Sequence, residues 1–137
     1  MFVRGDRNPI NTTVPNTNFT TLSSKGNLQT GTQTFPASST SGAFTLIGNP
    51  YASPVDLNLV TRNNLLKRFY VWDPKLSSVG GYVIVYDNGS GFQFLPNGSP
   101  GAPTQYIQSS EAFFVQTDNL GTSPSIVFNE SNKSSSN

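Results

Sequence analysis

Any chemistry carried by this sequence would have to come from carboxylates. The chain contains neither histidine nor cysteine, which excludes Ser–His and Cys–His nucleophile pairs and zinc sites built from Cys and His. Hydrolysis of a glycosidic bond needs two carboxylates roughly 5–10 Å apart across a cleft. The seven available are Asp6, Asp56, Asp73, Asp87, Glu111, Asp118 and Glu130. Asp56 is typical of a helix cap, Asp73 of a strand end and Asp87 of a hairpin turn, so we predict no catalytic residues.

Two short motifs resemble binding sequences, but each has a simpler interpretation. Arg4-Gly5-Asp6 spells the integrin-binding tripeptide, yet three residues followed by Pro9 are typical of a tight turn, which we favour. Residues 87–91 (Asp-Asn-Gly-Ser-Gly) suggest a calcium loop but lack its alternating acidic pattern and distal Glu. We expect a hairpin turn there and no metal site, while a calcium ion held elsewhere by Asp and backbone oxygens stays an alternative.

Aromatic side chains offer the other binding chemistry. The chain has 10 Phe, 5 Tyr and a single Trp. Tyr70 and Trp72 occupy alternate positions of one predicted strand, as Tyr82 and Tyr86 do in the next, so each pair shares a face of its strand. Exposed, these four rings would form a platform that stacks on the apolar faces of sugars. We favour the alternative, that they fill the core, because hydrophobic residues make up only 34% of the chain and large rings bury much area each.

The elements that would position these residues are short β runs separated by clusters of Gly, Pro, Asn and Ser. The expected strands are 2–4, 18–22, 28–35, 43–47, 68–72, 81–86, 92–95, 106–107, 112–116 and 125–128. One short helix is expected near residues 54–60, because Ser53, Pro54 and Asp56 form a start like a capping box. Without βαβ alternation, the predicted fold is all-β, a two-sheet antiparallel sandwich that is jelly-roll-like.

The domain organisation follows from length and composition. At 137 residues the chain is of ordinary size for one domain. We expect residues 1–128 to form a single β-sandwich module, a fragment of a larger protein, because no signal peptide follows Met1 and residues 2–4 look like the end of a strand. The Ser-rich residues 129–137 are expected to be a polar tail or linker.

Charge and hydropathy exclude two classes of partner. The formal net charge is +1 and only 11% of residues are charged, and Lys67-Arg68 is the one adjacent pair of cations. Nucleic acid binding needs a basic patch, so we expect none. No apolar run approaches the roughly 18 residues that a spanning helix requires, so we expect no membrane span.

Six segments of the sequence follow one recurrent pattern. They are residues 44–51 (Phe-Thr-Leu-Ile-Gly-Asn-Pro-Tyr), 53–56 (Ser-Pro-Val-Asp), 70–74 (Tyr-Val-Trp-Asp-Pro), 81–83 (Gly-Tyr-Val), 107–115 (Ile-Gln-Ser-Ser-Glu-Ala-Phe-Phe-Val) and 128–131 (Phe-Asn-Glu-Ser). With the opening residues 2–7, they resemble a module of very large secreted surface proteins of Bacteroidetes. That module typically lies near the C-terminus, ahead of a type IX secretion sorting domain.

The resemblance implies export, attachment at the cell surface, a non-catalytic role and neighbouring domains of the same polypeptide as partners. It assigns no binding residues. In this reading Gly48-Asn49-Pro50-Tyr51 is a structural corner, in which Pro50 holds Asn49 extended and the Asn49 amide ties nearby backbone groups.

We therefore expect a non-catalytic structural or spacer module of a secreted multidomain cell-surface protein, with no enzyme activity and no cofactor. A carbohydrate-binding or adhesin module is the alternative, with Tyr70, Trp72, Tyr82 and Tyr86 as its platform and a glycan as partner. A carboxylate hydrolase is a third reading.

Overall fold

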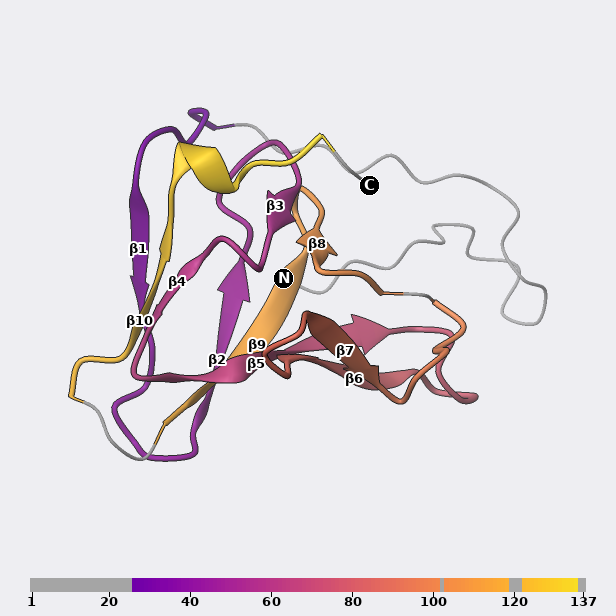
Figure 1. Cartoon of the computed structure of the whole chain (residues 1–137). Helices are drawn as coiled ribbons and strands as arrows, with labels where there is room; N and C mark the ends of the chain where they lie inside the picture. The colour runs from indigo at the N-terminus through magenta and orange to yellow at the C-terminus, as the bar shows by residue number, and fades with distance from the viewer. Residues whose placement is uncertain (1–25, 102, 119–121, 136–137) are drawn as a thin grey trace, which may run out of the picture.

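The structure, a computed structural model, describes residues 26–101, 103–118 and 122–135, and its regular elements are almost all strands (Figure 1). In chain order they are β1 (Gln33–Pro36), β2 (Phe44–Gly48), β3 (Val55–Asp56), β4 (Thr61–Asn63), β5 (Leu65–Asp73), β6 (Gly81–Asp87), β7 (Phe92–Leu95), β8 (Tyr106–Ile107), β9 (Ala112–Thr117) and β10 (Ser125–Phe128). The all-β prediction is confirmed. The strands expected at 2–4 and 18–22, and the Arg4-Gly5-Asp6 tripeptide, lie outside the described residues.

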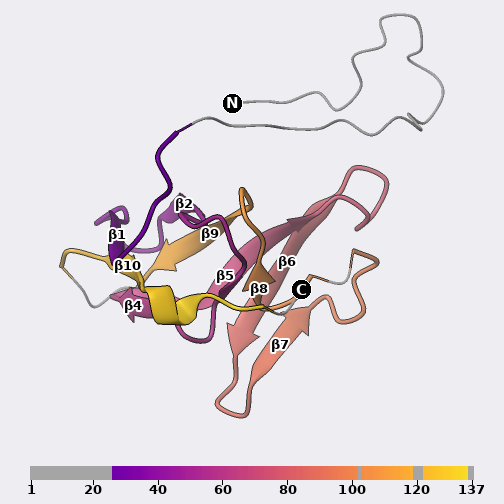
Figure 2. The same ribbon diagram turned by 90° about the horizontal axis from the view of Figure 1, so that it is seen from above.

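The strands form two main antiparallel sheets and one short ladder. The larger sheet has the order β2-β9-β5-β6-β7, the smaller has β1-β10-β4, and β3 pairs with β8. Each strand of the smaller sheet is a neighbour in the chain of one strand of the larger sheet. β1 is followed by β2, β4 is followed by β5, and β10 is preceded by β9. The order β1-β10-β4 therefore repeats the order β2-β9-β5, which is how a jelly roll wraps. The predicted jelly-roll-like sandwich is confirmed, with β7 remaining beside β6 in the larger sheet (Figure 2).

The core lies between the two sheets and takes alternate residues from their strands, as the period of two in a strand requires. The larger sheet contributes buried Phe69, Val71, Val83, Val85, Phe113 and Val115. Phe128 of the smaller sheet packs edge-on against Phe35 and Tyr51, with ring centroids 5.9 and 6.4 Å apart. Edge-to-face contact at these distances is the arrangement that aromatic pairs prefer.

The short helix expected near residues 54–60 is absent, and this prediction was wrong. Val55 and Asp56 instead form β3, which pairs with β8. Val55 and Leu57, two residues apart, are both fully buried, and Val60 is buried as well. The spacing from Val55 to Leu57 suits a strand, while Leu57 and Val60 alone are too few to give a helix a continuous apolar face.

Asp56 does not cap a helix. Its Oδ1 accepts a hydrogen bond from the N–H of Asn58 at 2.8 Å, which closes a local turn of the kind that competes with helix formation. The same carboxylate accepts a bond from Gln105 Nε2 at 3.1 Å. Asp56 therefore ties the turn after β3 to the loop that leads into β8.

The corner at residues 48–51 is built as expected around Asn49. Its Nδ2 lies 2.9 Å from the carbonyl oxygen of Ser53, 3.0 Å from that of Ile107 and 3.2 Å from that of Gln108. Its Oδ1 accepts a bond from the N–H of Tyr51 at 2.9 Å. One amide thus holds β2, the start of β3 and the end of β8 together, and the prediction that it ties backbone groups is confirmed.

Residues 129–132, expected to belong to a polar tail, are folded. Glu130–Asn132 forms one turn of 3-10 helix, and Asn132 is buried. Its Oδ1 accepts a bond from the N–H of Asn129 at 2.7 Å, and its Nδ2 donates to the carbonyl of Leu59 at 2.9 Å. The tail prediction was wrong for this turn, because the buried amide of Asn132 holds the turn against the sandwich by hydrogen bonds.

Arg62 closes the side of the sandwich where the smaller sheet ends. It lies opposite buried Ile126 in the β4–β10 register, so its side chain points between the sheets. The guanidinium carbon lies 5.3 Å from the ring centroid of Phe69. Nη1 is buried and has no hydrogen-bond partner among the described residues. Burial lowers the pKa of the Arg62 guanidinium, which the charge of Asp87 partly offsets.

Candidate functional site

The outward-pointing side chains of the larger sheet form the candidate site, here named the outer face. They occupy the positions that alternate with the core residues in each strand. The name covers its large apolar and aromatic members, which are Phe44 and Leu46 of β2, Phe114 of β9, Tyr70 and Trp72 of β5, Tyr82, Ile84 and Tyr86 of β6, and Leu95 of β7. Three polar residues point to the same side of the sheet: Arg68 and Gln93 opposite Tyr86, and Gln116 opposite Phe44.

Strand register aligns these residues across the whole sheet. Leu46 lies opposite Phe114, and Phe114 lies opposite Tyr70. Tyr70 in turn lies opposite Ile84, which lies opposite Leu95. A single row of five large side chains therefore crosses all five strands, with Trp72 opposite Tyr82 alongside it.

Exposure overturns the favoured interpretation that the strand aromatics fill the core. Trp72 is 47% exposed, Tyr82 48% and Tyr86 36%, while Tyr70 is half-buried. The opposite alternation of the same strands fills the interior instead, with Phe69, Val71, Val83 and Val85. Compact β-branched residues pack well between sheets, so the interior did not need the four larger rings.

The rings of the outer face meet edge to face. Trp72 and Tyr82 have centroids 5.0 Å apart and planes at 73°. Tyr82 and Phe114 meet at 74°, and Phe44 and Tyr70 at 77°. A shallow depression of about 390 Å³ lies among Phe44, Tyr70, Tyr82 and Phe114. These pairs do not form the flat, coplanar platform that a sugar ring stacks on most fully.

Hydrogen-bonding groups are few within the outer face. The hydroxyl of Tyr70 donates its hydrogen to Gln116 Oε1 at 2.7 Å, so this hydrogen is already used within the protein. Phe44, Leu46, Ile84, Leu95 and Phe114 carry no polar side-chain atom. The middle of the outer face is therefore apolar, and its polar groups lie at the rim.

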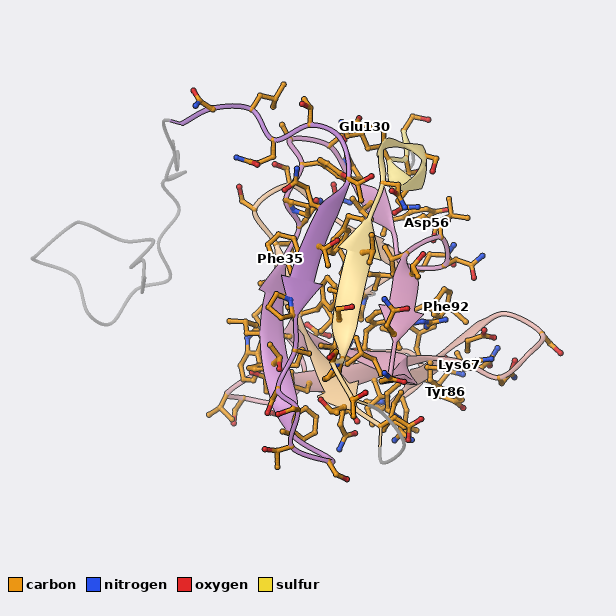
Figure 3. The ribbon with its side chains drawn as sticks, turned by 90° about the vertical axis from the view of Figure 1, so that its left-hand side faces the viewer. Phe35, Asp56, Lys67, Tyr86, Phe92 and Glu130 are labelled. Carbon is orange, nitrogen blue, oxygen red and sulfur yellow. The ribbon has the colours of Figure 1, made fainter. Side chains whose placement is uncertain are left out.

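Two cations lie at one end of this surface. The β5–β9 register shifts between Leu65 and Phe69, and Lys67 and Arg68 between them are both exposed. They line a second shallow depression of about 370 Å³ together with Tyr86 and Leu95. Figure 3 shows Lys67 and Tyr86 close together at the lower right, beyond β4. Asp87 is beside them, so the charge there is mixed.

The carboxylates serve a different purpose, best seen at Asp73. This side chain is buried and accepts hydrogen bonds from the Ser99 hydroxyl and from the N–H groups of Gly101 and Lys75, the last two at 2.8 Å. The Ser99 bond, and then the two backbone bonds, lower the pKa of Asp73 against the opposing effect of burial. A Cβ on Gly101 would come within 2.1 Å of Asp73 Oδ1, so only glycine fits there.

Four more carboxylates accept backbone N–H groups, three of them within local turns and Glu130 from a distant segment of the chain. Asp56 and Asp87 each accept a bond from the N–H two residues ahead, at 2.8 Å. Glu111 accepts one from the N–H of Gln108, and Glu130 one from that of Gly31. The Lys133 ammonium and the Gly31 N–H lower the pKa of Glu130. The hairpin predicted at residues 87–91 is confirmed, since it joins β6 to β7.

In the three described stretches, no group of three or more Asp and Glu side chains is placed to hold a metal ion. Nor does any helix in them have the length and hydropathy to cross a bilayer.

Fold and surface together define a jelly-roll β-sandwich with a broad apolar face on its larger sheet. The chain belongs to the family described as domain of unknown function DUF8693, whose model matches residues 1–137. Searches of curated proteins and of solved structures found no match.

Sequence reasoning singled out Tyr70, Trp72, Tyr82 and Tyr86 but missed the rest of the outer face. The missed members are Phe44, Leu46, Ile84, Leu95 and Phe114. A signal was present in β9, where Ala-Phe-Phe-Val is apolar on both faces of a strand. Such a run in an antiparallel sheet indicates that the outward face is apolar as well.

Proposed function

We propose that this chain is a non-catalytic structural module of a secreted, multidomain cell-surface protein. The use of its carboxylates is the observation that carries the proposal. Five of the six carboxylates in the described residues accept a backbone N–H, four of them within a turn or loop and Glu130 from the distant Gly31. General acid–base catalysis needs a carboxyl group free to exchange protons with a substrate, whereas these groups stabilise the chain itself.

Asp73 is the strongest of these cases. A buried carboxylate with a lowered pKa keeps its charge at neutral pH and gives up its proton readily, which is the opposite of what a general acid requires. It fastens the long connection between β7 and β8 to the end of β5. Secretion and surface attachment rest on the resemblance of residues 44–56 and 107–115 to modules of exported proteins.

Two measurements test this proposal. In the native full-length protein, protease added to intact cells should remove an epitope inserted in the hairpin at residues 88–91; an epitope that stays protected until lysis would contradict surface exposure. A glycan array and a panel of glycoside substrates should show neither binding below the millimolar range nor turnover. Turnover abolished by one carboxylate substitution that leaves the fold intact would overturn the structural role.

A carbohydrate-binding module is the second candidate, favoured by the exposure of Trp72 and Tyr82. Indole and phenol rings at the surface of a jelly roll can stack on pyranose faces even when they are not coplanar. The test compares Trp72→Ala with Val79→Ala, which removes an apolar side chain that is 82% exposed and lies outside the outer face. Glycan retention lost with the first and kept with the second would support this candidate, and equal retention would reject it.

A further inference from the structure

The outer face is as large as the largest apolar patches found on monomeric proteins, and such patches often serve in binding. Of its members, Phe44, Leu46, Trp72, Tyr82, Tyr86 and Leu95 are each between 36% and 59% exposed. At roughly 200 Å² for each large side chain when fully exposed, these six, which are about half-exposed, leave about 600 Å² of mostly apolar surface in contact with water. That equals the upper end of the largest patch found on a typical monomer, about 300–600 Å².

The row of five side chains can be matched to the same row of a second copy. It crosses the sheet from β2 to β7 without a charged residue. Two sheets pack face to face when their strands are within about 30° of one another, with side chains from both faces interdigitating. A twofold axis through the middle of the row, near Tyr70, would place the row of one copy on the row of another.

Area and charge both suit a second copy of the chain. Two such surfaces would bury about 1,200 Å², which is the lower bound of specific, stable protein interfaces. The formal net charge of +1 produces little long-range repulsion between copies. The cations Lys67 and Arg68 lie at the rim, where interfaces are normally polar.

We propose that this chain forms an isologous dimer in which the outer faces of two copies pack against each other. The pairing is closed, because each copy uses its one apolar sheet face and offers the same surface to its partner. Interfaces of this size have dissociation constants from the micromolar range downward, and we expect the micromolar range because the area is at the lower bound. This inference does not depend on the proposed structural role or on secretion.

The chain offers its own reporter and its own matched control. Trp72 is the single tryptophan and lies in the outer face, so acrylamide quenching of its fluorescence measures whether that face is covered. Leu46 is 59% exposed in the outer face and Leu59 is 51% exposed outside it. Leu46→Glu and Leu59→Glu therefore introduce the same charge at equally exposed leucines, and neither disturbs the core.

The experiment combines sedimentation equilibrium with quenching of residues 1–137 at about 1 to 500 µM, a range that spans micromolar affinity. We expect monomer to convert to dimer as concentration rises, with Trp72 becoming protected over the same range. Leu46→Glu should weaken the dimer at least about tenfold, because it buries an unpaired carboxylate, while Leu59→Glu should behave as the unaltered chain.

Three results would overturn the proposal. One is a monomer at all concentrations with Trp72 freely quenched. Another is a monomer in which Trp72 is protected at every concentration, which would mean that another part of the same chain covers the outer face. The third is a dimer that Leu46→Glu leaves intact, which would place the contact elsewhere.

Discussion

Replacing Asn49 by alanine should remove a large part of the stability of this fold. The Asn49 amide has two hydrogens, which it distributes over three carbonyl oxygens 2.9 to 3.2 Å away, and its oxygen accepts the N–H of Tyr51. This amounts to about three full hydrogen bonds. Each bond contributes about 0.5–1.5 kcal/mol net, so Asn49→Ala should lower the free energy of unfolding by about 1.5–4.5 kcal/mol.

The assay is urea unfolding followed through the fluorescence of Trp72. The slope of unfolding free energy against urea concentration must be the same for each variant, so that a change in midpoint reports a change in stability. Asn49→Asp keeps the shape of the side chain but turns the donor into an acceptor facing three carbonyls, and should cost at least as much. Asn58→Ala, in an exposed turn, is the control. A loss below about 0.5 kcal/mol for Asn49→Ala, or one equal to the control, would refute the account of the corner, since about 1 kcal/mol is the net value of one bond.

Three further predictions concern other parts of the sandwich. The pKa of Asp73 is below its ordinary value of 3.8, so the Asp73 carboxylate stabilises the fold fully above that pH and loses this effect as the pH falls through the folded-state pKa. Asp73→Asn should therefore flatten the dependence of the unfolding free energy on pH below about 4, and an unchanged slope would contradict this. Gly80 has φ of +81°, and a Cβ at this residue would come within 2.4 Å of the Trp72 ring. Gly80→Ala should therefore cost at least about 1 kcal/mol of stability and shift the Trp72 emission maximum, and an unshifted spectrum would mean that the Trp72 ring does not lie against Gly80. Phe128→Ala should cost about 3–5 kcal/mol in the same urea assay, because it empties a fully buried ring site; a loss under half of that would show that the core collapses around the gap.

Much of the fold could be predicted from sequence because strand signals are local. β5 and β6 carry runs of β-branched and aromatic residues, and the stop at Asp73-Pro74 and the turn at residues 87–91 delimit them. β4 was missed because Thr61–Asn63 is short and its partner β10 is more than sixty residues away. The helix at Ser53 was predicted wrongly because the signals of a capping box and of an Asx turn begin with the same residues.

The outer face was predicted only in part, and the reason is physical. Alternation in a strand shows that Tyr70 and Trp72 share a face, but it does not show which face the second sheet covers. That depends on how β1, β10 and β4 wrap over β2, β9 and β5, which is a long-range property of the topology. The compact side chains Val83 and Val85 could have indicated the inner face, since they suit a narrow space between sheets.

Arg62 has a consequence for how this protein can assemble. β4 is an edge strand, and the free backbone groups of an edge are a template on which further strands can be added without limit. An inward-pointing charge on such a strand opposes this growth, because an added strand would seal the guanidinium away from water. Association by the outer face, in contrast, ends at two copies. At the β4 edge, Arg62 therefore hinders the contact that would propagate into fibres.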